Sequence, residues 1–546
     1  MSFLQLVRRE MHGSMPKLLF MSGVGGISNA SILAAINAGV QDAGSGQKPG
    51  LWAASLFLVA LFLFMRSQQY VTITATAEIE AIIHKLRLRI MDMIRRSELL
   101  EMEKIGRARI VAAVTSDTAV LTQASNMLCF TVQGAVMIFF VGLYVAYLSL
   151  TAFLLTVVIV SGAATIFHYK NRRLSEQKGE SAAWERRLFD RLTDFLDGFK
   201  EVRLNAARSD DLFADALEVS KTAANIKIRT QAETFKMIVT SQISMYILLG
   251  AVVFIAPNLS SLGGASIAKT TTALLFVVGA CFGLVQSIPI LLNANAAANR
   301  IGRLEQALQS ILIPRERPAA GAPRRFQRIE MHNIVFRYTD RFSDTVFKIG
   351  PIDFTLSAGE LVFITGGNGS GKSTFLRVLS GLYPPDSGEI LLDGRPVTNA
   401  NRDEYRELVS GIFFDYHLFK RLYGIPEADA DDVNRLLVEF RLADKTALTD
   451  GEFRTLDLSG GQRRRLALIV SLLEKRPIML LDEWTAEQDP EFRRKFYDEL
   501  LPEMLRAGAT IVVITHDDRY LDELRLPARR IKMDEGRIVE QRSVGG

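Results

Sequence analysis

Residues 366–374 read Gly-Gly-Asn-Gly-Ser-Gly-Lys-Ser-Thr, and this stretch decides the fold of the second half of the chain. It fits the pattern G-x-x-x-x-G-K-S/T, whose glycines let backbone N–H groups turn toward a phosphate. An apolar run at 361–364 precedes it and a helix-forming run at 375–379 follows it. We therefore predict a strand, a phosphate-binding loop and a helix, with nucleotide-binding residues Gly366, Gly367, Asn368, Gly369, Ser370, Gly371, Lys372, Ser373 and Thr374.

Two side chains of this loop have distinct predicted roles. Lys372 should reach the β- and γ-phosphates, and the Ser373 hydroxyl should ligate Mg²⁺. The N-terminus of the following helix adds a positive partial charge at the same place. The expected cofactors are therefore ATP and Mg²⁺.

Other strand ends add candidates for hydrolysis. Residues 478–483 form an apolar run that ends in Asp482 and Glu483. Asp482 is expected to hold Mg²⁺, and Glu483 to act as general base toward the attacking water. His516, at the end of the run 511–516, would contact the γ-phosphate, although a lone histidine at a strand end is more often satisfied locally. Tyr338 would stack on adenine, although a lone tyrosine near a strand usually packs.

A second glycine-containing motif, Leu-Ser-Gly-Gly-Gln, occupies residues 458–462 just before an amphipathic run at 463–475. Small residues at a helix N-terminus suit a second phosphate contact. This string lies after a phosphate loop and just before an apolar strand that ends in Asp-Glu, an order that chance rarely produces. Ser459, Gly460, Gly461 and Gln462 are therefore added to the nucleotide-binding set.

The first 300 residues have a different composition. The whole chain of 546 residues is 48% hydrophobic, with a mean hydropathy of +0.15. Six apolar stretches each approach the ~20 residues that a helix needs to cross hydrocarbon. They are residues 18–40, 51–73, 127–148, 150–168, 237–256 and 270–292. We predict a transmembrane domain at 1–313, a proline-containing linker at 314–325 and an α/β nucleotide-binding domain at 326–546.

Positive charge gives the expected orientation. Lysine and arginine crowd the connections after the second and fourth stretches and are almost missing from the alternate connections. By the positive-inside rule, the N-terminus, both long connections and the nucleotide-binding domain face the cytoplasm. The long connections have helical spacing, so we expect them to extend the membrane helices and to turn back through short helices at 103–107 and 198–205. The net charge of +5 gives no reason to expect nucleic acid, and the two cysteines lack metal or disulfide spacing.

The order of these motifs resembles that of the ATP-binding cassette (ABC) transporters, in the exporter type with one membrane domain and one cassette per chain. The resemblance implies an all-α six-helix transmembrane domain fused to an α/β P-loop cassette, in a domain-swapped homodimer. It also implies that Ser459, Gly460 and Gly461 act on the partner's nucleotide. The short turns would be coupling helices, and residues 486–489 would be the D-loop.

Two departures from the family pattern point to one branch. Phe414 stands where the family has glutamine, and Asp415 is the candidate to replace it as a metal ligand. Trp484 follows Glu483 where proline is usual. The text from Asp482 to Arg494 is similar to the exporters of cyclic peptides and peptide siderophores, such as the pyoverdine and syringomycin types.

The sequence thus predicts an ATP-driven exporter of a cyclic, lasso or siderophore-type peptide that works by alternating access, with itself, membrane lipid and the peptide-like cargo as partners. A lipid or multidrug exporter, an importer with exporter-like architecture and an ATP-gated channel or regulator are the alternatives. Intact Glu483 and His516 argue for turnover rather than gating. Cargo-lining candidates are the polar residues inside the apolar stretches: Arg66, Gln68, Gln69, Gln133, Gln286 and Asn293.

Overall fold

The computed structural model describes residues 3–10, 15–44, 48, 50–259, 264–312, 325–339, 346–425, 429–523 and 525–544. Contacts divide the chain into two compact units. The helical unit contains residues 1–91 and 108–306, and the cassette unit contains residues 92–107 and 307–546. The predicted linker lies almost entirely outside the described residues, so the predicted domain boundaries stay predictions.

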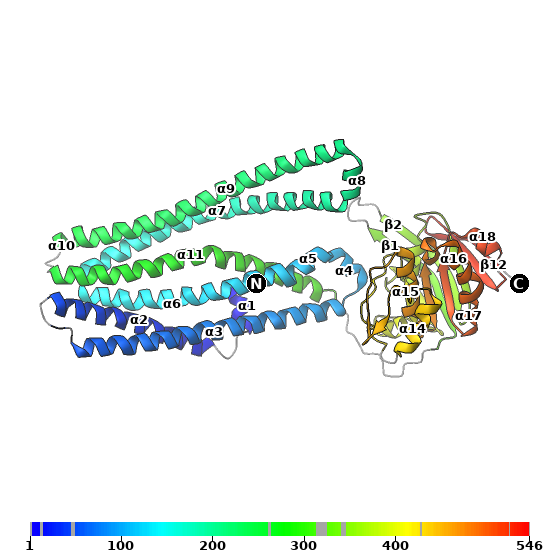
Figure 1. Cartoon of the computed structure of the whole chain (residues 1–546), viewed down its shortest axis with the longest axis horizontal. Helices are drawn as coiled ribbons and strands as arrows, with labels where there is room; N and C mark the ends of the chain where they lie inside the picture. The colour runs from blue at the N-terminus through cyan, green and yellow to red at the C-terminus, as the bar shows by residue number, and fades with distance from the viewer. Residues whose placement is uncertain are drawn as a thin grey trace. The chain divides into compact units, whose positions relative to one another are not determined.

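Six long helices make up most of the helical unit (Figure 1). They are α2 (Met15–Gly44), α3 (Leu51–Arg95), α6 (Thr118–Leu148), α7 (Leu150–Asp197), α9 (Ala206–Gly250) and α11 (Gly264–Gln309). Four of them have 45 to 48 residues, about 70 Å at 1.5 Å per residue. That is more than twice the ~30 Å of a hydrocarbon core. These lengths agree with the expected extensions of the membrane helices, which stay a prediction.

Five segments of the described chain are long and apolar enough to cross a membrane. They are Pro16–Ala43, Leu51–Arg95, Arg107–Leu148, Ala206–Leu259 and Ile267–Gln309. The remaining predicted span, 150–168, coincides with a shorter apolar segment, Leu150–Ile166, at the start of α7. Lys170 closely follows that segment. The structure therefore supports five of the six predicted spans by length and composition, and the sixth stays a prediction.

Short helices connect the long ones. The turn predicted at 103–107 is α4 (Leu99–Ile105), which begins four residues earlier and ends at Gly106, whose φ is 86°. The turn predicted at 198–205 is α8 (Phe199–Leu204). The other short helices in the first 260 residues are α1 (Phe3–Glu10), α5 (Arg107–Ala112), η1 (Ala113–Asp117), η2 (Ala251–Ile255) and α10 (Ala256–Leu259).

The cassette unit is built on two main sheets. A six-stranded sheet has the order β12-β11-β3-β10-β9-β6, and a four-stranded antiparallel sheet has the order β2-β1-β4-β5. The large sheet contains β3 (Leu361–Thr365), β6 (Val409–Ile412), β9 (Ile478–Asp482), β10 (Thr510–Ile514), β11 (Ala528–Asp534) and β12 (Arg537–Val544). The small sheet contains β1 (Arg328–Thr339), β2 (Val346–Ser357), β4 (Ser387–Leu392) and β5 (Arg395–Pro396), and a separate hairpin pairs β7 (Leu448–Thr449) with β8 (Glu452–Phe453).

The central strands are apolar along their whole length because both faces of the sheet are covered. Every residue of β3, β9 and β10 is buried. Alternate residues enter two different cores: Phe363 and Leu481 belong to one cluster, Ile364 and Leu480 to the other. The covering helices are α12 (Lys372–Leu379), α13 (Arg402–Arg406), α14 (Ala430–Glu439), α15 (Gly460–Leu473), η3 (Trp484–Glu487), α16 (Pro490–Lys495), η4 (Phe496–Leu500), α17 (Leu501–Arg506) and α18 (Asp518–Asp522).

Candidate functional site

The predicted catalytic residues meet at the carboxyl ends of the central strands of the large sheet. Strand β10 runs parallel to β3 on one side and to β9 on the other. Ile514 lies level with Ile364 on β3 and with Asp482 on β9. The carboxyl ends of three strands therefore place the phosphate loop, the two carboxylates and His516 side by side, although they are up to 150 residues apart in sequence.

Two glycines of the phosphate loop are required by its geometry. Gly366 has a φ of 146°, and a Cβ there would lie 2.2 Å from the Met533 carbonyl oxygen. Gly371 has a φ of 95° and lies against Ile349, whose Cγ2 would be 2.7 Å from a Cβ. A side chain at either position would combine an unfavourable φ with a clash. The loop is thus fixed between β11 and β2 with its shape already formed.

Lys372 closes the loop on itself. Its Nζ donates hydrogen bonds to the carbonyl oxygens of Gly366 at 3.0 Å and Gly367 at 2.9 Å. The side chain is buried, and this burial lowers the pKa of Lys372, while the charges of Glu483 and Asp482 oppose the shift. The ammonium therefore lies within the loop where the predicted phosphate contact requires a positive charge.

The predicted magnesium ligands lie next to each other. The Ser373 hydroxyl donates to Asp482 Oδ1 at 3.2 Å. Asp482 Oδ2 is buried and has no hydrogen-bond partner among the described residues. Burial raises the pKa of Asp482, while the Ser373 hydroxyl and the Phe414 backbone amide favour its ionised form. A hydroxyl beside a carboxylate oxygen without a partner fits an oxygen-seeking divalent cation such as Mg²⁺.

The predicted general base is held in an uncommon backbone conformation. Glu483 has a φ of 50°, in the left-handed region that non-glycine residues rarely adopt. Its N–H donates to the Ile514 carbonyl at 3.0 Å, and its own carbonyl accepts from the Arg464 guanidinium. Its carboxylate Oε1 lies 3.2 Å from His516 Nε2. These contacts aim Glu483 and His516 at the same space beside the phosphate loop.

The Leu-Ser-Gly-Gly-Gln motif forms the N-terminus of α15. Ser459 and Gln462 make a reciprocal capping box, in which each side chain accepts the other's backbone N–H. A Cβ on Gly460 or Gly461 would lie 2.3 Å or 2.6 Å from oxygens of Glu487. Gln488 Nε2 donates to the Gly461 carbonyl at 3.1 Å. The predicted D-loop therefore packs directly on this motif within one chain.

The motif on α15 does not reach the phosphate loop of its own chain. Among the described residues, no hydrogen bond or ion pair joins Ser459–Gln462 to residues 366–374, and their polar contacts are with each other and with the predicted D-loop. Polar contacts thus hold the motif to the predicted D-loop and not to the phosphate loop, as expected if the motif acts on a partner's nucleotide.

The two departures from the family pattern have different partners. Phe414 is 63% exposed, and the Arg464 guanidinium lies 5.7 Å from its ring centroid. Asp415 pairs with Arg377 at 3.1 Å, and its proposed metal contact stays a prediction. Trp484 is fully buried and donates its indole N–H to the Arg464 carbonyl at 2.8 Å. Arg464 therefore joins Phe414, Glu483 and Trp484, a role that the sequence did not reveal.

Tyr338, the predicted adenine platform, is 38% exposed on β1. Its antiparallel neighbour is Phe347 on β2, and the Phe347 ring lies 3.3 Å from where a Cβ on Gly371 would be. The tyrosine thus occupies the strand next to the one that abuts the phosphate loop. Stacking on adenine stays a prediction.

Polar contacts that start near the phosphate loop hold helix α4 within the cassette unit. Arg377 on α12 contacts Asp415 and, at 3.4 Å, the Tyr383 hydroxyl. Tyr383 donates to Glu103 of α4 at 2.9 Å. Glu98, just before α4, pairs with Arg406 and also lies 3.6 Å from Arg402. Arg377, Tyr383 and Arg406 were not predicted, because their partners are far away in sequence.

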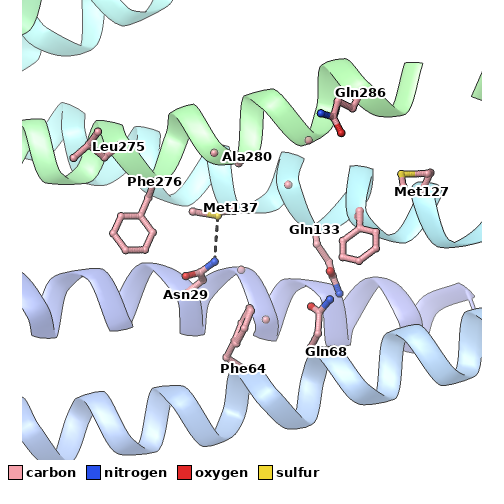
Figure 2. A pocket seen from close by; sticks show the side chains of 16 residues that line it. Asn29, Phe64, Gln68, Met127, Gln133, Met137, Leu275, Phe276, Ala280 and Gln286 are labelled. Carbon is pink, nitrogen blue, oxygen red and sulfur yellow. Dashed lines mark hydrogen bonds between the residues drawn. The ribbon is translucent and has the colours of Figure 1, made fainter. Parts of the chain in front are cut away.

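Three of the six predicted cargo residues line one pocket in the helical unit. Gln68, Gln133 and Gln286 border a cavity of about 650 Å³ between α2, α3, α6 and α11 (Figure 2). Arg66, Gln69 and Asn293 are not among its lining residues. The Arg66 guanidinium lies instead 5.5 Å from the centroid of the Phe62 ring. Asn29, which is not one of the six predicted cargo residues, also lines the pocket.

Comparison with known proteins identifies the family. A family model described as "ABC transporter" matches residues 349–486. The ATP-binding protein SyrD of Pseudomonas syringae pv. syringae is 32% identical, over 98% of this chain and 96% of SyrD. The ATP-dependent lipid A-core flippase of Paraburkholderia xenovorans is 26% identical, over 90% and 83%. The probable syringafactin export ATP-binding/permease protein SyfD of Pseudomonas syringae pv. syringae is 33% identical, over 38% and 34%.

A solved structure agrees with the architecture. The structure of a bacterial Atm1-family ABC exporter with ATP bound matches 98% of this chain and 95% of that chain with a TM-score of 0.75, at 19% identity. This likeness shows a helical transmembrane region and an ABC ATPase domain in one chain. The chain therefore belongs to the ABC transporter family. It is a multi-pass membrane protein in which ATP hydrolysis is coupled to transport, and the predicted resemblance is confirmed.

Proposed function

We propose that this protein is a homodimeric exporter that moves a peptide out of the cytoplasm across the bacterial inner membrane. Transport is supported by the proximity of Ser373 to Asp482 and of Glu483 to His516. The described part of the same chain also contains five helices long and apolar enough to cross a membrane. The peptide part of the proposal rests on the similarity to SyrD along nearly the whole chain and to SyfD, whose name includes syringafactin export.

The proposed pairing of two chains is supported by the contacts of the two nucleotide-binding motifs. Among the described residues, the capped N-terminus of α15 makes polar contacts with the predicted D-loop and none with the phosphate loop. In a head-to-tail dimer, Ser459, Gly460 and Gly461 would meet a nucleotide held by the partner's loop. Two ATP would then bridge the cassettes, and closure would be driven by contacts that exist only when nucleotide is bound.

Within one chain, each group of the site has a proposed task. Bound Mg²⁺, held by Ser373 and Asp482, would neutralise charge on the phosphates. Lys372 would leave the carbonyls of Gly366 and Gly367 to bind phosphate oxygens. Glu483 would accept the proton of the attacking water, and His516, 3.2 Å from its carboxylate, would orient it.

The test uses the full-length protein in lipid nanodiscs and in sided vesicles. ATPase activity is titrated with neutral cyclic lipopeptides, linear peptides, peptide siderophores and a phosphorylated glycolipid. We expect saturable stimulation by one peptide class, together with ATP-dependent accumulation of that peptide in inside-out vesicles. Equal stimulation by every amphiphile would contradict a peptide exporter. Transport in the opposite direction would show an importer instead.

A lipid exporter is the second candidate, because the lipid A-core flippase of Paraburkholderia xenovorans matches 90% of this chain. In the same vesicles, a lipid exporter would move the phosphorylated glycolipid and leave the peptides behind. The two candidates share every cassette residue, so only the cargo experiment separates them.

A further inference from the structure

The cavity in the helical unit has an unusual lining for a site among membrane-length helices. Four carboxamides border it, from Asn29, Gln68, Gln133 and Gln286, and the other lining residues are glycine, alanine or apolar side chains. None of the described lining residues is aspartate, glutamate, lysine, arginine or histidine. Figure 2 shows Gln68 and Gln133 pointing toward one another across it. Polar groups at such positions are costly in a membrane and usually mark a functional pathway.

These amides are poorly satisfied by the protein itself. Gln133 Nε2 is buried and has no hydrogen-bond partner among the described residues. Asn29 Nδ2 finds only the Met137 sulfur, at 3.2 Å, which is a weak acceptor. A buried donor without a partner destabilises a protein, because the loss of its water contacts is not compensated. The pocket thus presents unsatisfied hydrogen-bonding capacity that a ligand of the right chemistry would fill.

We propose that this pocket binds an uncharged, amide-rich segment of the cargo, namely a short stretch of peptide backbone with apolar side chains. This inference rests on the proposed function. A carboxamide offers both an N–H donor and a carbonyl acceptor, so it complements a peptide group, which offers the same pair. Phe64 and Phe276 supply apolar surface for the neighbouring side chains.

A charged group fits this cavity poorly. A phosphate or carboxylate needs arginine, lysine or several N–H donors, and an ammonium needs a carboxylate, whereas an unpaired charge among apolar helices is strongly disfavoured. Arg66 is near in sequence, but its guanidinium faces the Phe62 ring and not the pocket. The chemistry of the lining therefore favours a neutral peptide segment over a phosphorylated lipid headgroup.

The size of the pocket suits a segment and not a whole lipopeptide. Its volume of about 650 Å³ lies within the roughly 300–1,000 Å³ typical of small-ligand sites. Two lining glycines on α11, Gly279 and Gly283, have nothing within 4 Å of where a Cβ would be. They leave open space beside the carboxamides. A larger side chain at one of these glycines would fill the space and so test whether a ligand binds there.

The experiment measures binding of a defined probe to the full-length protein in nanodiscs without nucleotide. The probe is the neutral compound N-octanoyl-tetraalanine amide, and the competitors are octanoyl-phosphoethanolamine and the same acyl peptide with a free carboxylate. The test variants are Gln133→Leu and Gln286→Leu, which keep the side-chain size and remove the amide. The matched control is Gln69→Leu, because Gln69 is adjacent to Gln68 and lies outside the pocket.

We expect each test variant to weaken probe binding about three- to tenfold, the effect of one net hydrogen bond, and Gln69→Leu to leave it unchanged. The melting temperature of Gln133→Leu should stay equal or rise, because an unsatisfied buried donor is removed. Gly283→Leu should abolish binding by filling the cavity. Equal binding by the wild type, both glutamine variants and Gly283→Leu would overturn the proposal, and so would tighter binding of the phosphorylated competitor.

Export of a peptide and binding of the probe in this pocket are measured separately, so each can fail without the other. If vesicles export a peptide and Gln133→Leu exports it equally well, the function stands and the pocket assignment is wrong. If the nanodisc protein binds the neutral probe through these glutamines and no peptide is moved outward, the pocket assignment stands and the direction or the cargo is wrong.

Discussion

The Tyr383 hydroxyl donates a hydrogen bond to the Glu103 carboxylate at 2.9 Å and so joins α4 to the residues that follow the phosphate-loop helix. Burial and the bond to Glu103 raise the pKa of Tyr383 above its usual range, so the hydroxyl keeps its proton and remains a donor. Arg377, on the phosphate-loop helix itself, contacts the same hydroxyl and also Asp415. This connection runs beside Phe414, where the family's glutamine is replaced.

Tyr383→Phe tests whether that connection carries coupling. We expect basal ATPase activity to change less than twofold and stimulation by cargo to fall severalfold, because the lost bond contributes about 1 kcal/mol. Tyr423→Phe is the matched control, since Tyr423 is 70% exposed. ATPase titrations with and without cargo measure both quantities. Unchanged stimulation in Tyr383→Phe would show that coupling takes another route.

Glu483→Gln should remove hydrolysis and keep ATP binding. The amide cannot accept the proton of the attacking water, so we expect kcat to fall by about 10²–10⁴. Glu491→Gln, a change of an exposed carboxylate on α16, is the control. Phosphate release and nucleotide binding are measured on the same preparation. Substantial hydrolysis by Glu483→Gln would move the role of general base to another residue.

Asp482→Asn should be more stable than the wild type without Mg²⁺ and less stable than the wild type with Mg²⁺ and ATP. The raised pKa of Asp482 means that the folded cassette prefers the protonated carboxyl. Its stabilising contribution is therefore full below the ordinary aspartate range and is lost as the pH rises through the raised value. Without Mg²⁺ at pH 7, Asp482→Asn should be more stable than the wild type by about 1–3 kcal/mol.

Thermal unfolding at pH 7 and at roughly pH 5, with EDTA or with Mg²⁺ and ATP, checks this expectation. In EDTA, the difference in stability between the variant and the wild type should be smaller at the lower pH. In Mg²⁺ and ATP the wild type should become the more stable protein. A variant that gains as much stability from Mg²⁺ and ATP as the wild type would exclude Asp482 as a metal contact.

Trp484→Ala should unfold the cassette more easily. The indole is fully buried, its ring centroid lies 4.7 Å from that of Phe496, and its N–H bonds the Arg464 carbonyl. We expect a loss of about 3–5 kcal/mol in the free energy of unfolding. Trp484→Phe, which keeps most of the volume and loses the donor, should lose about 1 kcal/mol. Denaturation monitored by circular dichroism measures the loss of unfolding free energy in both variants. Equal losses in Trp484→Ala and Trp484→Phe would contradict the packing argument.

The phosphate loop, the strand ends and most of the long helices were predictable, because each is specified by residues close together in sequence. The glycines of residues 366–374 and the strand before them specify the loop locally. Each apolar run is itself long enough to indicate a membrane helix. The start of α4 was missed by four residues, since Glu98 and Leu100 are positioned by contacts within the cassette unit rather than by a local signal.

Pairings between distant segments were not predictable. Asp415 was a candidate metal ligand, yet its carboxylate pairs with Arg377, 38 residues away. In the sequence, Arg464 is only one of several arginines on an amphipathic helix. Its hydrogen bond to the Glu483 carbonyl and its cation–π contact with the Phe414 ring depend on how β9 and α15 pack. Asn29 was overlooked because a single amide in an apolar run has no pattern of its own.

The contacts of Lys372 with the carbonyls of Gly366 and Gly367 have a thermodynamic consequence. Nucleotide entry is an exchange of partners and not a simple addition, because the ammonium must give up two acceptors before it takes phosphate oxygens. The observed affinity for ATP is then a difference between two sets of bonds. Such a site releases its product more readily than the strength of the phosphate contacts alone suggests, which suits a machine that must reset after every cycle.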